Sequence, residues 1–464
     1  MSKKYEMDMC NGPILGKMIS FTVPVLLTAI LQLLYNAADV VVVGNYASGT
    51  ALGAVGATGS LVNLLLNVFV GLGVGVNVVT GQCIGSNRKE KVSEIIGCSV
   101  VIGLVSGIFL TAIGYFFSET FLSLMNVPDD ILPLATKYME IYFVGAPASI
   151  IYNFCTAVLR AYGDTKRPLI FLVISGLVNV VLNLFFVIVT GMDVDGVAWA
   201  TVISQYLSAV LVLIVLIRSK DYCRLDPKKL RFYKDSAAKI IRIGLPAGVY
   251  GSMFSISNVI IQSAVNSFGS SVIVSGISAS SSIEGFVYTG MNSVSVATTS
   301  FVSQNTGSGK FDRVKQVFFK SIALVTVIYA VMAAVALVFR YPIFSIYLPN
   351  DPDAVAFGIN RLIIICSTYF LCGYMDVATG CIRGMGYSTV TTIISVVGTC
   401  ILRLVWIFTI FNPVKASLDI NGALRLLYVV YPISWAVTLT GLLICFVIVL
   451  KRVRKKVSEQ SLTD

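Results

Sequence analysis

The amino-acid sequence predicts an all-α integral membrane protein with twelve transmembrane helices, arranged as two pseudo-symmetric six-helix bundles around a central cavity. The prediction rests on the composition, on long apolar stretches and on an internal repeat. The chain has 464 residues, of which 56% are hydrophobic and only 12% are charged, whereas soluble domains carry about 25% charged residues. Its mean hydropathy is +0.86. These values exclude an ordinary soluble enzyme.

The apolar stretches are each long enough for a membrane helix, which needs about 20 residues. Short polar loops rich in Gly, Pro, Asn and Asp separate them. The first residues are polar and contain no cleavable apolar segment, so we expect no signal peptide. We expect the spans at residues 16–43, 52–82, 93–117, 133–160, 168–190, 196–218, 238–266, 275–302, 316–340, 358–382, 389–411 and 425–450.

The basic residues form six clusters, and all six fall on one side of a twelve-span arrangement. The loops on the opposite side are acidic or neutral. The positive-inside rule therefore predicts that both termini lie in the cytoplasm. We attribute the net charge of +11 to this topology, and the basic residues are also suited to contact anionic lipid headgroups. We therefore expect no nucleic-acid partner. The clusters begin with Lys3, Lys4 and Lys17 and continue with Arg88, Lys89 and Lys91; Lys166 and Arg167; Arg224, Lys228, Lys229, Arg231 and Lys234; Lys310, Arg313 and Lys315; and Lys451, Arg452, Arg454, Lys455 and Lys456.

The sequence repeats itself with a shift of 222 residues. Each half carries six spans, an even number, which predicts a parallel repeat about an axis along the membrane normal. We expect an N-terminal bundle at 1–218, a cytoplasmic linker at 219–237 and a C-terminal bundle at 238–464. Rocking of two such bundles gives alternating access to a cavity between them. The matched pairs are Pro24 and Pro246, Asn36 and Asn258, Gln82 and Gln304, Gly85 and Gly307, and Ser86 and Ser308.

Two residue types limit the possible chemistry. Histidine is absent, which excludes His-based zinc sites and Ser-His triads and leaves Asp or Glu to carry any proton. The ten cysteines are scattered without a C-x-x-C pair, so we expect free thiols without disulfides. We expect no cofactor apart from a coupling ion.

Asp39 is a carboxylate deep in the first span, followed by four valines. A charge at the bilayer centre costs about 2.5–3.5 kcal/mol on insertion scales, and such residues often mark ion or substrate paths. Asn153, Asn179, Asn183 and Thr201 lie in the fourth to sixth spans, and Asn179 and Asn183 share one helix face. The five side chains could take up a proton at Asp39, or Na⁺ at Asp39, Asn179 and Thr201. Hydrogen bonds between helices are the alternative interpretation.

The C-terminal half contains the intramembrane charges Glu284, Asp376 and Arg403. One interpretation pairs Arg403 with one of the two acids, and the other gives a carboxylate a role in substrate attraction or ion coupling. Together with Asp39 these deep charges are net acidic, which favours cationic substrates. Aromatic rings attract organic cations and Met adapts to varied shapes, although ordinary packing also explains such side chains. The candidates for the substrate cavity are Tyr35, Phe254, Tyr288 and Met291.

Several motifs together resemble the MATE (multidrug and toxic compound extrusion) transporters, and within them the DinF-like bacterial branch. The resemblance covers nearly the whole chain. The residues that carry it are Pro24 and Asp39 in the first span, Gly81, Gln82 and Gly85 at the end of the second, Arg160-Ala-Tyr-Gly-Asp-Thr-Lys166 after the fourth, Gln304-Asn305 after the eighth and Arg383-Gly-Met-Gly386 after the tenth.

The resemblance implies a secondary antiporter in the bacterial plasma membrane that exports amphipathic, often cationic, compounds in exchange for H⁺ or Na⁺. It also implies a cation site in the N-terminal bundle, at positions that match Asp39, Asn153, Asn179 and Thr201. Asn183 departs from the pattern, because many relatives have Asp there, so a relay of two carboxylates is in doubt. We expect the chain to act as a monomer.

Other functions remain open from the sequence alone. A lipid-linked sugar flippase of the same superfamily usually has a basic cavity, whereas the deep charges here are net acidic. An intramembrane enzyme is disfavoured by the absence of histidine, and Ala-Tyr-Gly-Asp164 lacks the first Gly of a G-x-G-D protease motif. A transporter-like sensor that moves no substrate is a further alternative.

Overall fold

The computed structural model describes residues 7–46, 50–125, 127–219, 223–349 and 351–460. Lys3 and Lys4 of the first basic cluster lie outside the described residues, as do the side chains of Lys89 and Lys456. The described residues form helices and connecting turns without a β-strand. The ten cysteines are thiols that form no disulfide in the part of the chain that the structure describes.

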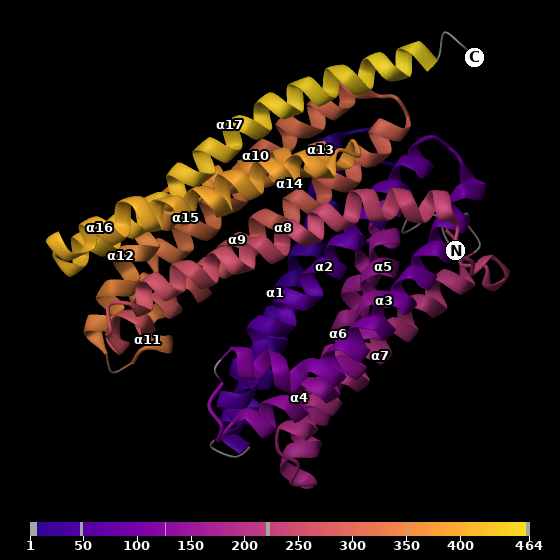
Figure 1. Cartoon of the computed structure of the whole chain (residues 1–464). Helices are drawn as coiled ribbons and strands as arrows, with labels where there is room; N and C mark the ends of the chain where they lie inside the picture. Colours follow the sequence, from indigo (N-terminus) through magenta and orange to yellow (C-terminus); the bar gives the residue numbers. More distant parts are fainter. Residues whose placement is uncertain (1–6, 47–49, 126, 220–222, 350, 461–464) are drawn as a thin grey trace. The chain divides into compact units, whose positions relative to one another are not determined.

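The first half of the chain folds into seven α-helices (Figure 1). They are α1 (Ile14–Tyr46), α2 (Ala51–Gly85), α3 (Lys89–Leu124), α4 (Leu132–Val144), α5 (Ala146–Tyr162), α6 (Lys166–Leu184) with the π-helix η2 (Phe185–Val189), and α7 (Val194–Arg218). A short 3₁₀ turn, η3 (Pro227–Lys229), follows.

The second half repeats this order with added short elements. They are α8 (Lys234–Asn266), α9 (Ser271–Gly307), α10 (Phe311–Val338), α11 (Arg340–Tyr347), α12 (Pro352–Thr368), α13 (Phe370–Gly384), α14 (Ser388–Ser395), η4 (Val396–Ile401), α15 (Leu402–Trp406), η5 (Ile407–Phe411), α16 (Asn412–Val414), η6 (Lys415–Ser417) and α17 (Ile420–Gln460). The helix α17, yellow in Figure 1, has 41 residues.

Nine described helices are long and apolar enough to cross a membrane, and two bent pairs bring this number to eleven. The pair α4 and α5 bends by 45° and the pair α12 and α13 by 47°, at the positions of the predicted spans 133–160 and 358–382. The helix α9 has 37 residues and covers the predicted span 275–302, but its many Ser, Thr and Gly residues make it less apolar. The all-helical membrane class predicted from the sequence is confirmed.

The chain divides into two compact units, and each is described by itself. Unit 1 comprises Met1–Met9 and Val23–Val249, and unit 2 comprises Cys10–Thr22 and Tyr250–Asp464. The division therefore falls inside α1 and inside α8. Pro24 and Pro246, the repeated prolines, lie within these two helices, where a proline removes one backbone hydrogen bond and favours a kink.

Small residues allow the helices of unit 1 to pack closely. A Cβ on Gly71 of α2 would lie 2.2 Å from the Cα of Gly248 in α8, and one on Gly107 of α3 would lie 2.3 Å from the Cα of Pro147 in α5. Helices in a bilayer gain little from the hydrophobic effect, so close van der Waals contact between small residues drives their association. These contacts hold the helices that carry the polar residues of the unit.

The internal repeat extends to local irregularities. Phe185–Val189 and Ile407–Phe411 are both π-helical, and the shift of 222 residues superimposes one segment on the other. Such wide turns are rare and frequently occur at functional sites. In unit 1 the wide turn begins two residues after Asn183, and in unit 2 it begins one helical turn after Arg403. The repeat is therefore present in the structure as well as in the sequence.

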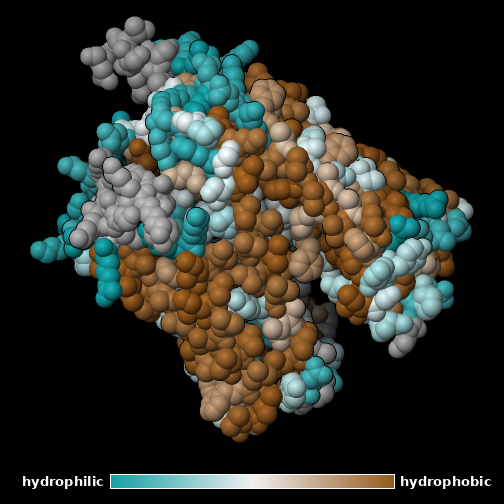
Figure 2. Space-filling model, turned by 180° about the vertical axis from the view of Figure 1, so that it is seen from behind, coloured by the Kyte–Doolittle hydropathy of each residue, from teal (hydrophilic) through white to brown (hydrophobic). Residues whose placement is uncertain are grey.

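The outer surface is that of a membrane protein. Apolar residues cover broad continuous areas of the face shown in Figure 2, and hydrophilic residues gather toward the ends of the helices. Many large apolar side chains are exposed, such as Val181, Phe319 and Ile444 at 64%, 67% and 59%. Broad continuous apolar areas are rare on soluble monomers. Such a surface suits contact with the lipid of a membrane.

Candidate functional site

A polar cluster in unit 1 joins α1, α6 and α7. The Nδ2 group of Asn183 donates to Oδ1 of Asp39 at 2.5 Å and to Oδ1 of Asn179 at 3.3 Å. Asn179 in turn donates to Oγ1 of Thr201 at 3.4 Å, and Thr201 donates to the carbonyl oxygen of Val197 at 3.0 Å. Asn183 is fully buried, Asn179 is buried, and Asp39 is half-buried. One carboxylate therefore lies at the end of a chain of neutral donors.

The helical repeat explains why these side chains meet. Gly176, Asn179 and Asn183 are separated by three and four residues, so they share one face of α6. Tyr35 and Asp39 likewise share a face of α1. The ring of Tyr35 lies directly against Gly176, where an added Cβ would be 2.0 Å from Cε2. The glycine thus lets α1 approach α6 one turn before Asp39.

The structure brings four of the five predicted coupling residues together. Asp39, Asn179, Asn183 and Thr201 form the cluster, whereas Asn153 donates to the carbonyl oxygen of Ser149 in its own helix at 3.1 Å. The buried Oδ1 of Asn183 has no hydrogen-bond partner among the described residues. The role of the cluster in coupling stays a prediction at this point.

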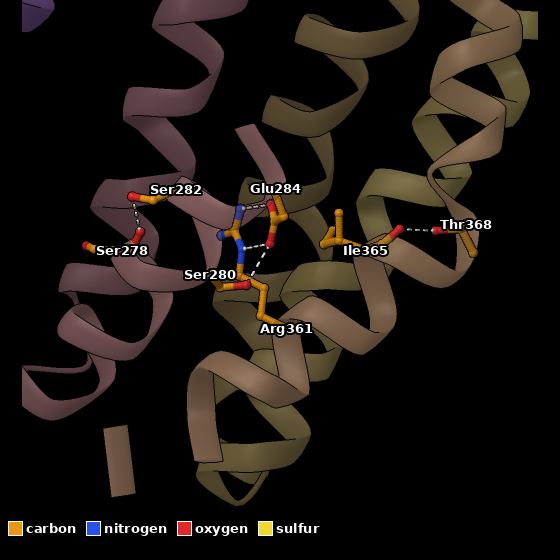
Figure 3. A network of polar contacts seen from close by, with 7 residues as sticks. All are labelled: Ser278, Ser280, Ser282, Glu284, Arg361, Ile365 and Thr368. Atoms are coloured by element: carbon orange, nitrogen blue, oxygen red, sulfur yellow. Dashed lines mark hydrogen bonds and ion pairs between the residues drawn. The ribbon is translucent and has the colours of Figure 1, made fainter. Parts of the chain in front are cut away.

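Unit 2 contains a buried ion pair between α9 and α12 (Figure 3). Arg361 contacts Glu284 in a bidentate manner, with Nε 2.9 Å from Oε1 and Nη2 3.0 Å from Oε2. Ser280 donates to Oε1 of Glu284 at 2.8 Å, one turn along α9. The guanidinium also lies 5.5 Å from the ring centroids of Tyr428 and Tyr431 in α17. The pair thus links three helices.

One of the two interpretations, the pairing of Arg403 with Glu284 or Asp376, is not seen in the described part of the chain. Glu284 pairs with Arg361 instead, a residue that sequence analysis overlooked because it lies near the start of the predicted span 358–382. Arg403 is only 1% exposed, and its Nε donates to Oγ of Ser434 at 3.1 Å. With Arg361 included, the buried acids and arginines of this group in unit 2 balance.

Arg403 and Asp376 each have a buried atom without a hydrogen-bond partner in the described part of the chain. For Arg403 these atoms are Nη1 and Nη2, and for Asp376 the atom is Oδ2. The Arg403 guanidinium lies 4.4 Å from the ring centroid of Tyr431 and 5.8 Å from that of Phe254. Asp376 interacts electrostatically with Arg383, the first residue of the repeated motif at 383–386. From the sequence alone, Arg383 is identified only as a motif residue.

The candidate substrate residues differ in their surroundings. Met291 is fully buried, and its sulfur would be 2.9 Å from a Cβ on Gly373, so it packs inside unit 2. Tyr288 is half-buried and accepts a hydrogen bond from Asn292 at 3.3 Å. Phe254 is half-buried beside Arg403. Of the candidates in unit 2, only Phe254 and Tyr288 retain an exposed portion.

The loop that follows α5 holds the motif at 160–166 in a fixed turn. Gly163 adopts φ +94°, and an added Cβ would meet Met7 at 2.6 Å. Asp164 accepts a hydrogen bond from the backbone NH of Arg167 and forms an ion pair with its Nε at 2.9 Å. Burial raises the pKa of the Asp164 carboxyl group, and the charge of Arg167 opposes that rise. The motif residues thus stabilise the start of α6, the helix that carries the amide cluster.

A helical membrane protein built from two repeated units, with a carboxylate and an ion pair buried within its spans, has the features of a secondary transporter. Comparison with known proteins identifies the family. The MatE family model matches residues 24–185 and 246–409. The chain belongs to this family of transporters, and the prediction that it is a transporter and not an enzyme is confirmed.

Relatives and solved structures agree with this assignment. The chain is 28% identical to the probable multidrug resistance protein YoeA of Bacillus subtilis over 90% of both chains. It is 29% identical to the probable multidrug resistance protein YpnP of the same species, over 85% of this chain and 88% of the relative. A transporter of the MOP superfamily from Pyrococcus furiosus matches 95% of this chain and 98% of its own, with a TM-score of 0.88 and 19% identity. That last likeness shows the fold alone.

Proposed function

We propose that this MATE transporter is an H⁺-coupled antiporter that exports amphipathic, often cationic, compounds across a bacterial plasma membrane, with both termini in the cytoplasm. Relatives named as multidrug resistance proteins support the substrate class. The basic clusters on one side of the spans support the orientation. The quoted motifs support the DinF-like branch, and we expect a monomer because each chain carries both repeated units.

The observation that carries the proposal is the bond from Asn183 to Asp39. It leaves a single carboxylate among neutral partners in a bilayer span. Taking such a group out of water disfavours its charged form, and a proton removes the charge. Asn183 donates to Oδ1 of Asp39, so Oδ2 can take the proton while the other bonds of the cluster persist.

The same bonds argue against Na⁺ at Asp39, Asn179 and Thr201. The amide oxygen of Asn179 already accepts from Asn183, and the hydroxyl oxygen of Thr201 already accepts from Asn179. Hard cations need several free oxygen ligands. Each of these oxygens keeps a second lone pair, so a sodium ion would compete with the two hydrogen bonds, whereas a proton on Asp39 leaves both in place.

The driving force is adequate for export. A membrane potential supplies about 2.3 kcal/mol per charge for each 100 mV. Since a factor of ten in concentration corresponds to about 1.4 kcal/mol, one proton exchanged for a neutral compound moves one net charge inward and supports a gradient of roughly fortyfold at 100 mV. One proton exchanged for a monovalent cation moves no net charge, so the pH gradient alone drives it, at about tenfold per pH unit.

The test is uptake of ethidium into proteoliposomes under separate gradients of pH and of Na⁺. We expect the pH gradient alone to drive ethidium against its concentration gradient and the Na⁺ gradient alone to have no effect. Uptake driven only by Na⁺ would show that the coupling ion is misassigned. Absence of uptake under both gradients would contradict cation antiport.

A second candidate substrate class carries an anionic group, as lipid-linked pyrophosphates do. The observation that favours it is the buried Arg403, whose Nη1 and Nη2 have no acceptor among the described residues. Tetramethylrhodamine and its methyl ester form a suitable pair of probes, because they differ only in a free carboxylate. Preferred transport of the methyl ester supports cation export, and preferred transport of the free acid that is lost in Arg403→Met supports this second candidate.

A further inference from the structure

An apolar groove lies on unit 2 between α9, α10 and α11. Its volume is about 250 Å³, and its wall contains no charged side chain. Ile283, Val287 and Ala336 form a buried floor at 5%, 2% and 4% exposure. Val331 and Val335 form an edge that is 59% and 50% exposed. The remaining lining residues are Phe286, Met332, Ile343 and Tyr347.

Tight packing on either side of the groove keeps it open. Met332 of α10 lies so close to Gly290 of α9 that an added Cβ would be 2.3 Å from its sulfur. Phe344 of α11 fills the space beside Gly358 of α12, where an added Cβ would be 2.2 Å from Cε1. These contacts fix α10 against α9 and α11 against α12. The residues between them cannot collapse onto one another without disturbing both contacts.

The groove lies in the half of the bilayer remote from the Lys310–Arg313 turn. The helix α10 has 28 residues and is about 42 Å long, so its last residues reach the far boundary of the hydrocarbon region. Val331 and Val335 lie in its last two turns. Tyr341 and Tyr347 follow at the depth where aromatic side chains commonly contact lipid headgroups.

A cation stands at the end of the groove. Arg340, Ile343 and Tyr347 are separated by three and four residues and therefore share one face of α11, and the last two line the groove. The Nη1 of Arg340 donates to the carbonyl oxygen of Leu337 at 2.8 Å. Its Nε is buried and has no acceptor among the described residues, and its guanidinium lies 4.9 Å from the Tyr341 ring centroid.

We propose that this groove binds an acyl chain of an anionic phospholipid whose phosphate is recognised by Arg340. The groove has a volume of about 250 Å³ and an exposed edge at Val331 and Val335, which suits a segment of an acyl chain whose remainder stays in the bilayer. An acyl chain gains little hydrophobic energy by leaving the bilayer for an apolar groove, so selectivity must come from the headgroup. Arginine matches a phosphate with its planar fork of donors. The lipid is one from the outer leaflet if the termini are cytoplasmic.

Native mass spectrometry of the purified full chain tests the proposal. The probes are phosphatidylglycerol and phosphatidylcholine with identical oleoyl chains. One headgroup contact near a membrane surface contributes enough for a preference of about fivefold, so we expect one retained phosphatidylglycerol in that excess. Arg340→Gln should abolish the preference while some lipid still binds.

Groove-filling variants separate the acyl site from general lipid adhesion. Val335→Trp places a large ring over the groove at an exposed position, and Val331→Trp is a second such variant. Both should lose the retained lipid. Ala334→Trp is the matched control, because it is exposed at the same end of α10 but lies on another face of the helix and outside the groove, and it should bind lipid as the unaltered chain does.

Three results would overturn the proposal. They are equal retention of both lipids by the unaltered chain, an unchanged preference in Arg340→Gln, and undiminished retention in both groove-filling variants. Displacement of the lipid by ethidium, with loss of ethidium transport in Val335→Trp, would assign the groove to the substrate instead.

Discussion

Removing one partner of the buried Glu284–Arg361 pair should destabilise unit 2 in an asymmetric way. Arg361→Met leaves Glu284 charged and buried with only Ser280 as a donor, and breaking a buried pair in this way costs about 3–5 kcal/mol. Glu284→Gln leaves Arg361 buried, but the guanidinium keeps the rings of Tyr428 and Tyr431 at 5.5 Å. Each ring contributes about 0.5–2 kcal/mol, so with two rings this variant should lose about 1–4 kcal/mol less.

Replacing both charges should restore most of the stability, because a buried ion pair rarely outperforms well-packed neutral side chains. The assay is thermal unfolding of the purified protein in detergent. For a cooperative unit of about 230 residues, 1 kcal/mol corresponds to roughly 2 °C. We therefore expect Arg361→Met to lower Tm by about 6–10 °C, Glu284→Gln by less, and the double variant Glu284→Gln/Arg361→Met by about 2 °C or less.

This reasoning also predicts that the pair is structural, so the double variant should export ethidium at the rate of the unaltered chain. Equal Tm losses for the two single variants would refute the role assigned to the tyrosine rings. A double variant as unstable as Arg361→Met would refute the account of an uncompensated charge. Normal stability with lost export would show that the pair acts in transport.

Three further predictions concern unit 1. Asn183→Asp places a second carboxylate against Asp39, and because two adjacent carboxylates share a proton, it should move the pH at which transport is half-maximal upward; an unchanged pH profile would contradict the contact. Gly176→Ala should clash with Tyr35 and lower Tm, and adding Tyr35→Ala should recover stability if that contact is the cause. Asp164→Asn removes the ion pair with Arg167 and should lower Tm without changing the pH profile of transport, and a changed profile would give Asp164 a role in coupling.

The spans and the repeat were predictable because they depend on local properties. Apolar length predicts a membrane helix directly, and the shift that aligns Pro24 with Pro246 also aligns the π-helical segments Phe185–Val189 and Ile407–Phe411. The bends within the predicted spans 133–160 and 358–382 were not predicted. They occur at Gly145 and Tyr369, and no periodicity in the apolar pattern marks them.

The residues of the site were predictable where their spacing along one helix places them on the same face. Asn179 and Asn183 share a face, and they lie together beside Asp39. Asn153 was grouped with them on residue type alone, but its amide bonds within its own helix. Arg361 was missed for a different reason, since pairing across helices depends on rotation and depth that a single sequence does not show. The signal that could have revealed Arg361 was the presence of an arginine within an apolar span.

The most direct test of the coupling role of Asp39 is proton movement driven by substrate in sodium-free proteoliposomes. A pH-sensitive dye inside the vesicles reports H⁺ flux when ethidium is added on one side. The account predicts ethidium-dependent proton flux with the unaltered chain and none with Asp39→Asn, while Asn153→Ala, which removes an amide outside the cluster, retains it. Proton flux in Asp39→Asn equal to that of the unaltered chain would contradict the central claim.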